Sequence, residues 1–249
     1  MKRTILTAAA WLLVMTTWGA AAYAQPETER ATTDEAKRVR DAASAFQAVM
    51  HAPDNAIPQA ILDKAEGIAV FPNVLKVAVG FGGERGKGVI SVRNRATNTW
   101  SAPAFLTLTG GSWGAQIGGQ STDIILVVMN RRGLESLMNS EFKIGGEASA
   151  AAGPVGRHAS ASTDAAMHAE ILSYSRSRGL FAGVSLSGAA VREDMDSNEH
   201  FYGSRLHTRE VTIEGASKTA PQIVAVWRDT LGKYFMSDRT ATSGKRDKK

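Results

Sequence analysis

The stretch AVGFGGERGKGVISV, residues 78–92, determines which fold classes are open to the chain. Five of its residues are glycine, and they surround Glu84, Arg85 and Lys87. Glycine adopts backbone conformations that other residues avoid, so such a run suits either a phosphate-binding loop or a tight turn. The flanking residues distinguish the two.

The glycines match neither of two common nucleotide-binding motifs. A P-loop needs Gly-Lys followed by Ser or Thr, whereas Gly86 and Lys87 are followed by Gly88. A dinucleotide-binding fingerprint needs its third glycine where Arg85 stands, and a helix after it. The residues that follow, GVISVRN, are alternating and β-branched, which predicts a strand. The stretch therefore predicts a hairpin with one strand to about Phe81, a glycine-rich turn, and a second strand from Gly88.

Short apolar or alternating runs continue this β pattern along most of the chain. They include VLKVAVGF, WSAPAFLTLTG, TDIILVVMN and AEILSYSRSRGLFAGVSLSGAAV, and the last of them is REVTIEG, residues 209–215. Because no helix separates most consecutive runs, a parallel doubly wound sheet is disfavoured. The many glycine pairs suit strongly bent strands. The sequence predicts an α+β fold with a strongly bent, largely antiparallel sheet or a partly closed barrel, and with packed N- and C-terminal helices.

Two amphipathic segments predict these helices. Apolar residues recur at three- and four-residue spacing from Thr33 until Pro53 ends the pattern. Residues 221–235, PQIVAVWRDTLGKYF, form the second, and we expect Trp227, Leu231 and Tyr234 to be buried against the sheet. PQAILDKAE and RRGLESLMNS predict two short helices.

The first residues predict export. A charged start with Lys2 and Arg3, an apolar run and a small-x-small site ending at Ala24 are typical of a cleaved signal peptide. The run is short for a membrane span and lacks stop-transfer charges. We expect a periplasmic or extracellular protein, free or peripheral on a membrane. The predicted organisation is a signal peptide over 1–24, a disordered leader over 25–32, a single domain over 33–236 and a basic disordered tail over 237–249.

Composition excludes several classes of protein. The chain has no cysteine, so it has neither disulfides nor a lipid on an N-terminal cysteine. Its formal net charge of +5 falls to +3 once Lys2 and Arg3 are removed. That mild excess favours anionic surfaces but is too small to indicate a nucleic-acid partner. We predict no cofactor and no resident metal.

One motif resembles a hydrolase site. GGSWG matches a nucleophile elbow with Ser112 as nucleophile, and Asp164 with His168 or His200 would follow in hydrolase order. That elbow must join a strand to a helix, whereas WGAQIGGQSTDIILVV predicts another strand. A glycine-rich turn is the favoured interpretation, and the chain is expected not to be an enzyme.

The segment DMDSNEH resembles the start of a calcium loop. Asp194, Asp196 and Asn198 occupy its first three ligand positions, but Glu199 stands where the turn glycine belongs and Arg205 where the final glutamate belongs. A polar loop with a helix cap is favoured, and a weak, irregular calcium site stays open. The five histidines show no ligand spacing.

Several of these runs together resemble the SYLF domain. IPQAILDKAEGIAVFPNVLKVAVGFGGERGKGVISVRN is similar to its opening block, LTLTGGSWGAQIGGQSTDIILVVMN to the next, and SYSRSRGLFAGVSLSGAAVREDMDSNEHFYG to the last. The resemblance covers residues 33–236. It implies a lipid-binding module: eukaryotic members bind phosphoinositides, and the yeast actin-patch proteins also bind actin filaments. It assigns no catalytic role to Ser112 or to the Asp194 cluster.

Lipid contact in this family is often assigned to a basic N-terminal helix. Here the cations of that helix are offset by acids, so packing on the core is at least as well supported. Phosphoinositides are also not expected outside the bacterial cytoplasm. Lys37, Arg38 and Arg40 are therefore secondary lipid-binding candidates beside Asp34, Glu35 and Asp41.

A cationic segment around the quoted hairpin offers a second candidate. Five basic residues face one acid, Glu84, and backbone N–H groups freed by glycine could join them on a phosphate. We predict binding to anionic, phosphoinositide-like phospholipid head groups here. The alternatives are a structural or protein-interaction module with an envelope or host protein partner and, less favoured, a serine hydrolase. The predicted lipid-binding residues are Lys76, Arg85, Lys87, Arg93 and Arg95.

Overall fold

The protein folds around one curled sheet, as the α+β prediction requires. The computed structural model describes residues 27–52, 56–79, 81–112, 118–146, 148–156, 168–186, 188–216 and 221–235. Their helices are α1 (Glu27–Met50), α2 (Gln59–Lys64), α3 (Arg131–Leu137), α5 (Met195–Tyr202), α6 (Thr208–Thr212) and α7 (Ile223–Phe235). Their strands are β1 (Gly67–Val79), β2 (Phe81–Asn94), β3 (Thr99–Trp100), β4 (Ala104–Ser112), β5 (Gly118–Val128), β6 (Glu141–Lys143), β7 (Ala150–Ala152), β8 (Ile171–Ser177), β9 (Leu180–Gly183) and β10 (Ala190–Glu193).

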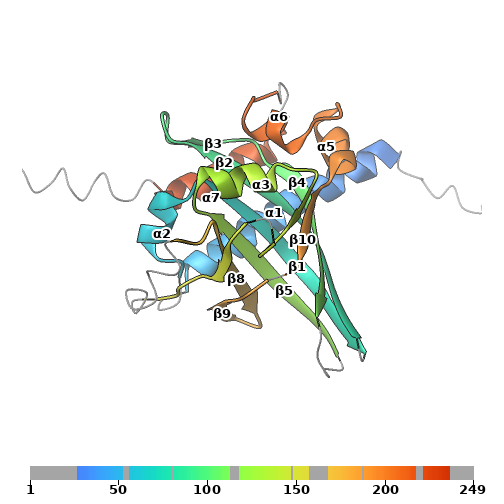
Figure 1. The fold of residues 1–249 in the computed structure, drawn as a ribbon. Helices are drawn as coiled ribbons and strands as arrows, with labels where there is room; N and C mark the ends of the chain where they lie inside the picture. Colours follow the sequence, from blue (N-terminus) through green and yellow to red (C-terminus); the bar gives the residue numbers. More distant parts are fainter. Residues whose placement is uncertain are drawn as a thin grey trace, which may run out of the picture.

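The described strands form a ten-stranded sheet in the order β6-β10-β4-β2-β1-β5-β8-β7, with β3 beside β2 and β9 beside β8. All of its pairs are antiparallel except β7 with β8, so the sheet is mixed. The sheet curls into a half-barrel (Figure 1). The ends of β1, β2, β4 and β5 project to the lower right of Figure 1, beyond the helices.

The predicted hairpin exists, but its turn was placed wrongly. β1 and β2 are paired up to Val79 and Phe81, and β2 then runs without interruption through all the remaining glycines to Asn94. Arg85 and Lys87 therefore stand on a strand rather than on a turn. The second strand begins seven residues earlier than Gly88, because it is paired on both sides, with β1 and with β4.

The glycines of β2 are explained by close packing. The register of β1 against β2 shifts between Val70 and Leu75, which marks a bulge in β1. A Cβ on Gly88 would lie 2.4 Å from the carbonyl oxygen of Val70. A Cβ on Gly86 would lie 2.6 Å from a methyl group of Val74. Glycine is needed here so that the bulged strand can approach its neighbour.

The N-terminal helix covers one face of the sheet. α1 contacts β1 and β2 as well as α5 and α7. Val39, Ala43 and Phe46 of its predicted apolar face are buried. The helix begins at Glu27 rather than Thr33, so most of the predicted leader is helical, and acids in the first turn suit the helix dipole.

The C-terminal helix packs as predicted. Trp227 and Leu231 of α7 are fully buried, and the indole Nε1 of Trp227 donates a 2.7 Å hydrogen bond to the hydroxyl of Ser91 in β2. Tyr234 is only partly buried. The last described helix is therefore anchored to β2, a central strand of the sheet.

Two short helices were not predicted. The REVTIEG segment, predicted as a strand, supplies four of the five residues of α6. This helix begins after His207 and is stabilised by a carboxylate oxygen of Glu210, which accepts the His207 backbone N–H at 2.6 Å. Its β-branched residues favoured a strand in isolation. The DMDSNEH segment forms most of α5, so the predicted polar loop is wrong although its helix cap, Asp194, is confirmed.

Within the described residues, no helix is both long and apolar enough to cross a membrane.

Candidate functional sites

The predicted basic patch is divided between two places on β2. Arg85 lies opposite Leu75 of β1, in the half of the projecting hairpin nearer its turn, where it lines a groove together with residues of α1. Arg93 lies opposite Trp100 of β3, close to the other end of β2. Since six residues separate Lys87 from Arg93, the two groups of cations are about 20 Å apart along the strand. They form two sites rather than one.

The projecting site combines cations with an exposed apolar side chain. Leu75 is 53% exposed, and its partner Arg85 is exposed and has no charged partner among the described residues. Lys87 is 57% exposed, and its Nζ lies 4.0 Å from a carboxylate oxygen of Asp194, which is a long and weak ion pair. Lys76, by contrast, forms a 3.1 Å ion pair with Glu84. Arg85 and Lys87 are therefore the available cations, and Lys76 is largely neutralised.

A groove between α1 and β2 adjoins this site. It has a volume of about 570 Å³ and brings Lys37 of α1 to the same depression as Arg85 and Lys87. Asp34, Glu35 and Asp41 line the same groove, and Lys37 already pairs with Asp41 at 2.5 Å. The acids largely cancel the cations of the helix, as the sequence predicted.

Arg38 is buried rather than presented to a surface. Its side chain is 8% exposed, donates to the Asp194 carboxylate at 3.0 Å and to the Ser197 hydroxyl at 3.2 Å, and lies over the ring of Phe105. Burial raises the pKa of Asp194, but the Ser197 hydrogen bonds and the Arg38 charge outweigh it and lower the pKa overall. Arg38 thus ties α1 to α5, while Arg40 is exposed.

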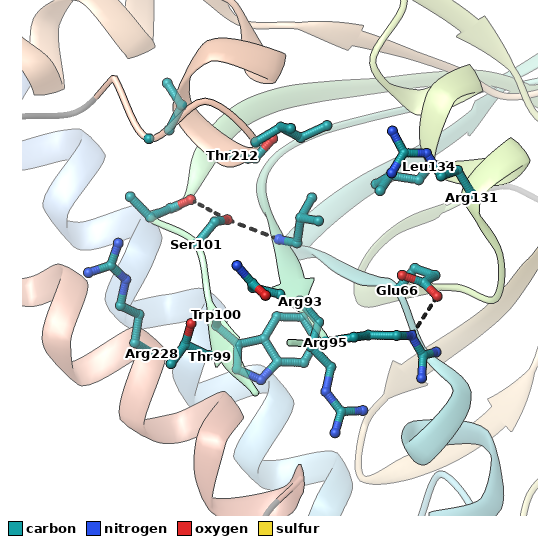
Figure 2. Close-up of a pocket in the computed structure, with 16 residues that line it drawn as sticks. Glu66, Arg93, Arg95, Thr99, Trp100, Ser101, Arg131, Leu134, Thr212 and Arg228 are labelled. Atoms are coloured by element: carbon teal, nitrogen blue, oxygen red, sulfur yellow. Dashed lines mark hydrogen bonds and ion pairs between the residues drawn. The ribbon is translucent and has the colours of Figure 1, made fainter. Parts of the chain in front are cut away.

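The second site is an open pocket of about 610 Å³ at the other end of β2. We call it the arginine pocket, after its four guanidinium groups. Figure 2 shows them on different sides of the pocket, with Arg228 across from Arg95 and Arg131. One acid, Glu66, lines it with them, as do apolar residues of β2, β3, α3 and α6. The four arginines are Arg93, Arg95, Arg131 and Arg228.

Two of these arginines are held in place by local contacts. The Arg93 guanidinium donates to the Asn98 side chain at 2.6 and 2.9 Å and lies over the ring of Phe235. Arg95 pairs with Glu66 at 2.6 Å. Sequence reasoning found both residues but missed Arg131 and Arg228, because only the tertiary fold brings α3 and α7 to β2.

The suspected calcium ligands serve the fold. Asp194 caps α5 through the Ser197 backbone N–H, and the Asn198 side chain joins the Phe105 N–H to the Leu206 carbonyl. Asp196 pairs with Arg205 at 3.3 Å. Across the described residues, no group of three or more His, Asp or Glu side chains is arranged to hold a metal ion.

The hydrolase residues do not form the expected motif. Ser112 ends β4, where it pairs with Gly82, and the next described element is the strand β5 rather than a helix. His200 lies on α5 and His168 comes just before β8. Asp164 lies outside the described residues, so the structure gives no triad geometry.

The pKa of one histidine, His207, is raised by a neighbouring carboxylate. His207 Nδ1 lies 3.0 Å from a carboxylate oxygen of Glu193. The hydrogen bond and then the charge of Glu193 raise the pKa of His207. This pair lies next to α6, whose last residues line the arginine pocket.

The described residues thus define an α+β domain built on a half-barrel, closed by helices from both ends of the chain and bearing charged surface depressions at both ends of β2. The model of one family, described as Ysc84, Las17-binding protein actin regulator, matches residues 109–234. The chain belongs to this family, the SYLF-domain family, so the resemblance seen in its sequence is confirmed.

Known relatives are larger proteins. LAS seventeen-binding protein 3 of Saccharomyces cerevisiae is 35% identical over 187 residues, which is 73% of this chain and 40% of that protein. SH3 domain-containing YSC84-like protein 1 of Xenopus laevis is 32% identical over 152 residues, 61% of this chain and 45% of that protein. The chain therefore spans less than half the length of either relative.

Proposed function

We propose that this chain is a non-enzymatic module that binds anionic phospholipid head groups through the projecting half of the β1–β2 hairpin. The observation that carries the proposal is the exposed pair of Leu75 and Arg85, directly opposite each other on neighbouring strands. An apolar side chain beside a cation matches the chemistry of a membrane interface, where acyl chains lie just below phosphates.

A second exposed cation supports this placement. Lys87 is two residues from Arg85 on β2, so the two side chains lie on the same face of the strand. Each cation near an anionic surface contributes about 1 kcal/mol, so Arg85 and Lys87 support weak, salt-sensitive binding. Arg93 and Arg95 lie too far along β2 to share that surface.

Export is part of the proposal. The apolar run and the site ending at Ala24 support secretion to the periplasm or beyond, where phospholipid surfaces are accessible. N-terminal sequencing of the exported protein should find Gln25 first, and an exported chain beginning at Met1 would contradict this.

Liposome co-sedimentation tests the lipid proposal. Vesicles rich in phosphatidylglycerol should bind the wild type at low salt, and vesicles of phosphatidylcholine should not. Arg85→Glu with Lys87→Glu removes two cations and adds two anions, so binding should weaken at least about thirtyfold. Both side chains are exposed, so the variant should keep its melting temperature to within a few degrees.

Two matched double variants complete the experiment. Lys143→Glu with Arg209→Glu makes the same charge change at exposed positions elsewhere and should bind vesicles like the wild type. Lys37→Glu with Arg40→Glu tests the N-terminal helix and should have the smaller effect, because acids already offset that helix. Equal losses in all three variants, or the largest loss in the helix variant, would overturn the hairpin assignment.

A protein-interaction function is the second candidate. It is supported by the names of the relatives, which describe one as binding LAS seventeen and others as containing an SH3 domain. Those names belong to proteins more than twice as long as the matched segment, so they point to a class of function and not to a partner of this chain.

A further inference from the structure

We propose that the arginine pocket is a separate binding site for an acidic peptide segment that carries an aliphatic anchor residue. This inference does not rest on lipid binding, since it uses none of the residues of the projecting hairpin. It gives the protein-interaction candidate a site and a ligand chemistry.

The first argument is charge. Four arginines, from β2, from the turn after it, from α3 and from α7, face one acid in the pocket, Glu66. Arg131 is 76% exposed and its pairing with Glu135 is an exposed contact within one helix, which a ligand carboxylate can replace. Arg228 is exposed and has no carboxylate partner among the residues that the structure describes. The pocket therefore has an uncompensated positive charge.

The second argument is the spacing of the guanidinium groups. They stand around the pocket rather than pointing at one centre, with Arg228 on the side opposite Arg95 and Arg131 (Figure 2). Arg93 is fixed by Asn98 and lies over Phe235, so it is not free to swing towards the others. A single phosphate can contact only part of this set. An extended chain with several carboxylates can contact Arg131 and Arg228 on opposite sides of the pocket, in the bidentate geometry that arginine favours, while Arg93 and Arg95 add positive charge between them.

The third argument is the apolar lining. Ile213, which is 42% exposed, presents the apolar surface of the pocket between the arginines, and the buried side chains of Leu134 and Val211 lie in the lining beside it. The one aromatic ring in the lining, Trp100, is only 5% exposed because it packs edge-on against Phe235. No broad aromatic face is offered to a nucleic-acid base, whereas an aliphatic side chain fits beside Ile213. A peptide with alternating acidic and aliphatic residues can therefore contact both the arginines and the apolar lining.

Fluorescence anisotropy with a defined probe tests the proposal on the full chain. The probe is a short fluorescein-labelled peptide of glutamates and aspartates with two leucines. Wild type should bind it, and Arg131→Gln and Arg228→Gln should each weaken binding by at least about tenfold, as loss of a charge-assisted hydrogen bond does. Arg192→Gln removes an arginine of similar exposure from β10, outside the pocket, and should leave the affinity unchanged.

Competition experiments identify the ligand class. A probe with both leucines replaced by serine should bind less tightly, and equal affinity would overturn the apolar anchor. Inorganic phosphate that displaces the probe as effectively as unlabelled peptide would overturn the extended-ligand assignment in favour of a phosphate site. Loss of phosphatidylglycerol-vesicle binding in the Arg131→Gln and Arg228→Gln variants would overturn it in favour of a lipid site. Unchanged vesicle binding beside weakened peptide binding supports two separate sites.

Discussion

Replacing Trp227 with alanine should destabilise the protein more than an alanine at any other position of α7. The indole is fully buried and its Nε1 donates to Ser91, which is itself fully buried. A tryptophan buries roughly 150–250 Å² of surface, and at about 25 cal/mol per Å² that is about 4–6 kcal/mol of transfer free energy. An alanine side chain retains only a small part of this transfer free energy.

Two further effects set the expected magnitude. Tryptophan-to-alanine changes in cores cost about 3–5 kcal/mol, including the cavity that remains. The Ser91 hydroxyl keeps its hydrogen bond to the Ser101 carbonyl at 3.1 Å and loses only the indole donor, so this adds about 1 kcal/mol. We expect Trp227→Ala to lower the free energy of unfolding by about 4–6 kcal/mol. Such a loss is a large fraction of the total stability of a typical domain.

Urea denaturation followed by far-UV circular dichroism measures this change. With a slope of about 2 kcal/mol per molar urea, the midpoint should fall by about 2–3 M. Val226→Ala, at a 51% exposed position on the same helix, is the matched control and should shift the midpoint little. A loss under about 1 kcal/mol for Trp227→Ala would refute the packing of α7 on β2, and this helix would then be available for other contacts.

Two further predictions test the sheet and the His207 contact. Gly88→Ala would place a Cβ 2.4 Å from the Val70 carbonyl oxygen and should cost at least about 1–3 kcal/mol, whereas Gly83→Ala, whose nearest atom would be 3.8 Å away, should be tolerated; equal melting temperatures would show that the bulged strand adapts. The folded-state pKa of His207 lies above its ordinary value of 6.5, so its pairing with Glu193 stabilises the fold fully below that value and the contribution is lost as the pH rises through the higher folded-state pKa. The difference in melting temperature between wild type and His207→Gln should therefore shrink from pH 5 to pH 8, and a difference that grows with pH would contradict the sign of the shift.

The parts of the fold that repeat a simple period were predictable from the sequence. The apolar stripes of α1 and α7 identify their buried faces, because helical spacing and burial coincide at Phe46 and Trp227. The strands from β1 to β5 follow from alternation and β-branching. The resemblance to the SYLF domain added the order of the blocks.

The remaining elements depend on contacts that local sequence does not encode. α6 is β-branched at Thr208, Val211 and Thr212, and it is helical because Glu210 and Glu193 bond the backbone at its start. The glycines of β2 suggest a turn until the bulge of β1 is known, and then they explain a close approach instead. In both cases the tertiary partner decides the conformation.

The same limit applies to the candidate sites. The sequence has five basic residues in one segment. Because Lys87 and Arg93 are six positions apart on the same extended strand, they lie about 20 Å from each other, and the predicted patch is divided into two sites. Arg38 looks like a surface cation of an amphipathic helix, and only the position of Asp194 reveals that it is buried. Arg131 and Arg228 are far from β2 in sequence, so only the structure could group them.

The buried pair of Arg38 and Asp194 also constrains the order in which the chain can fold. The two residues are 156 positions apart, and Gln47 of the same helix meets Thr230 across 183 positions. Closing such long loops is slow, and a high contact order of this kind lowers the folding rate. Among the described helices α1 is synthesised first, yet it cannot make these contacts until α5 and α7 have also been synthesised. Until then the apolar stripe of α1 stays exposed, and a chaperone can bind it during that interval and hold the chain unfolded.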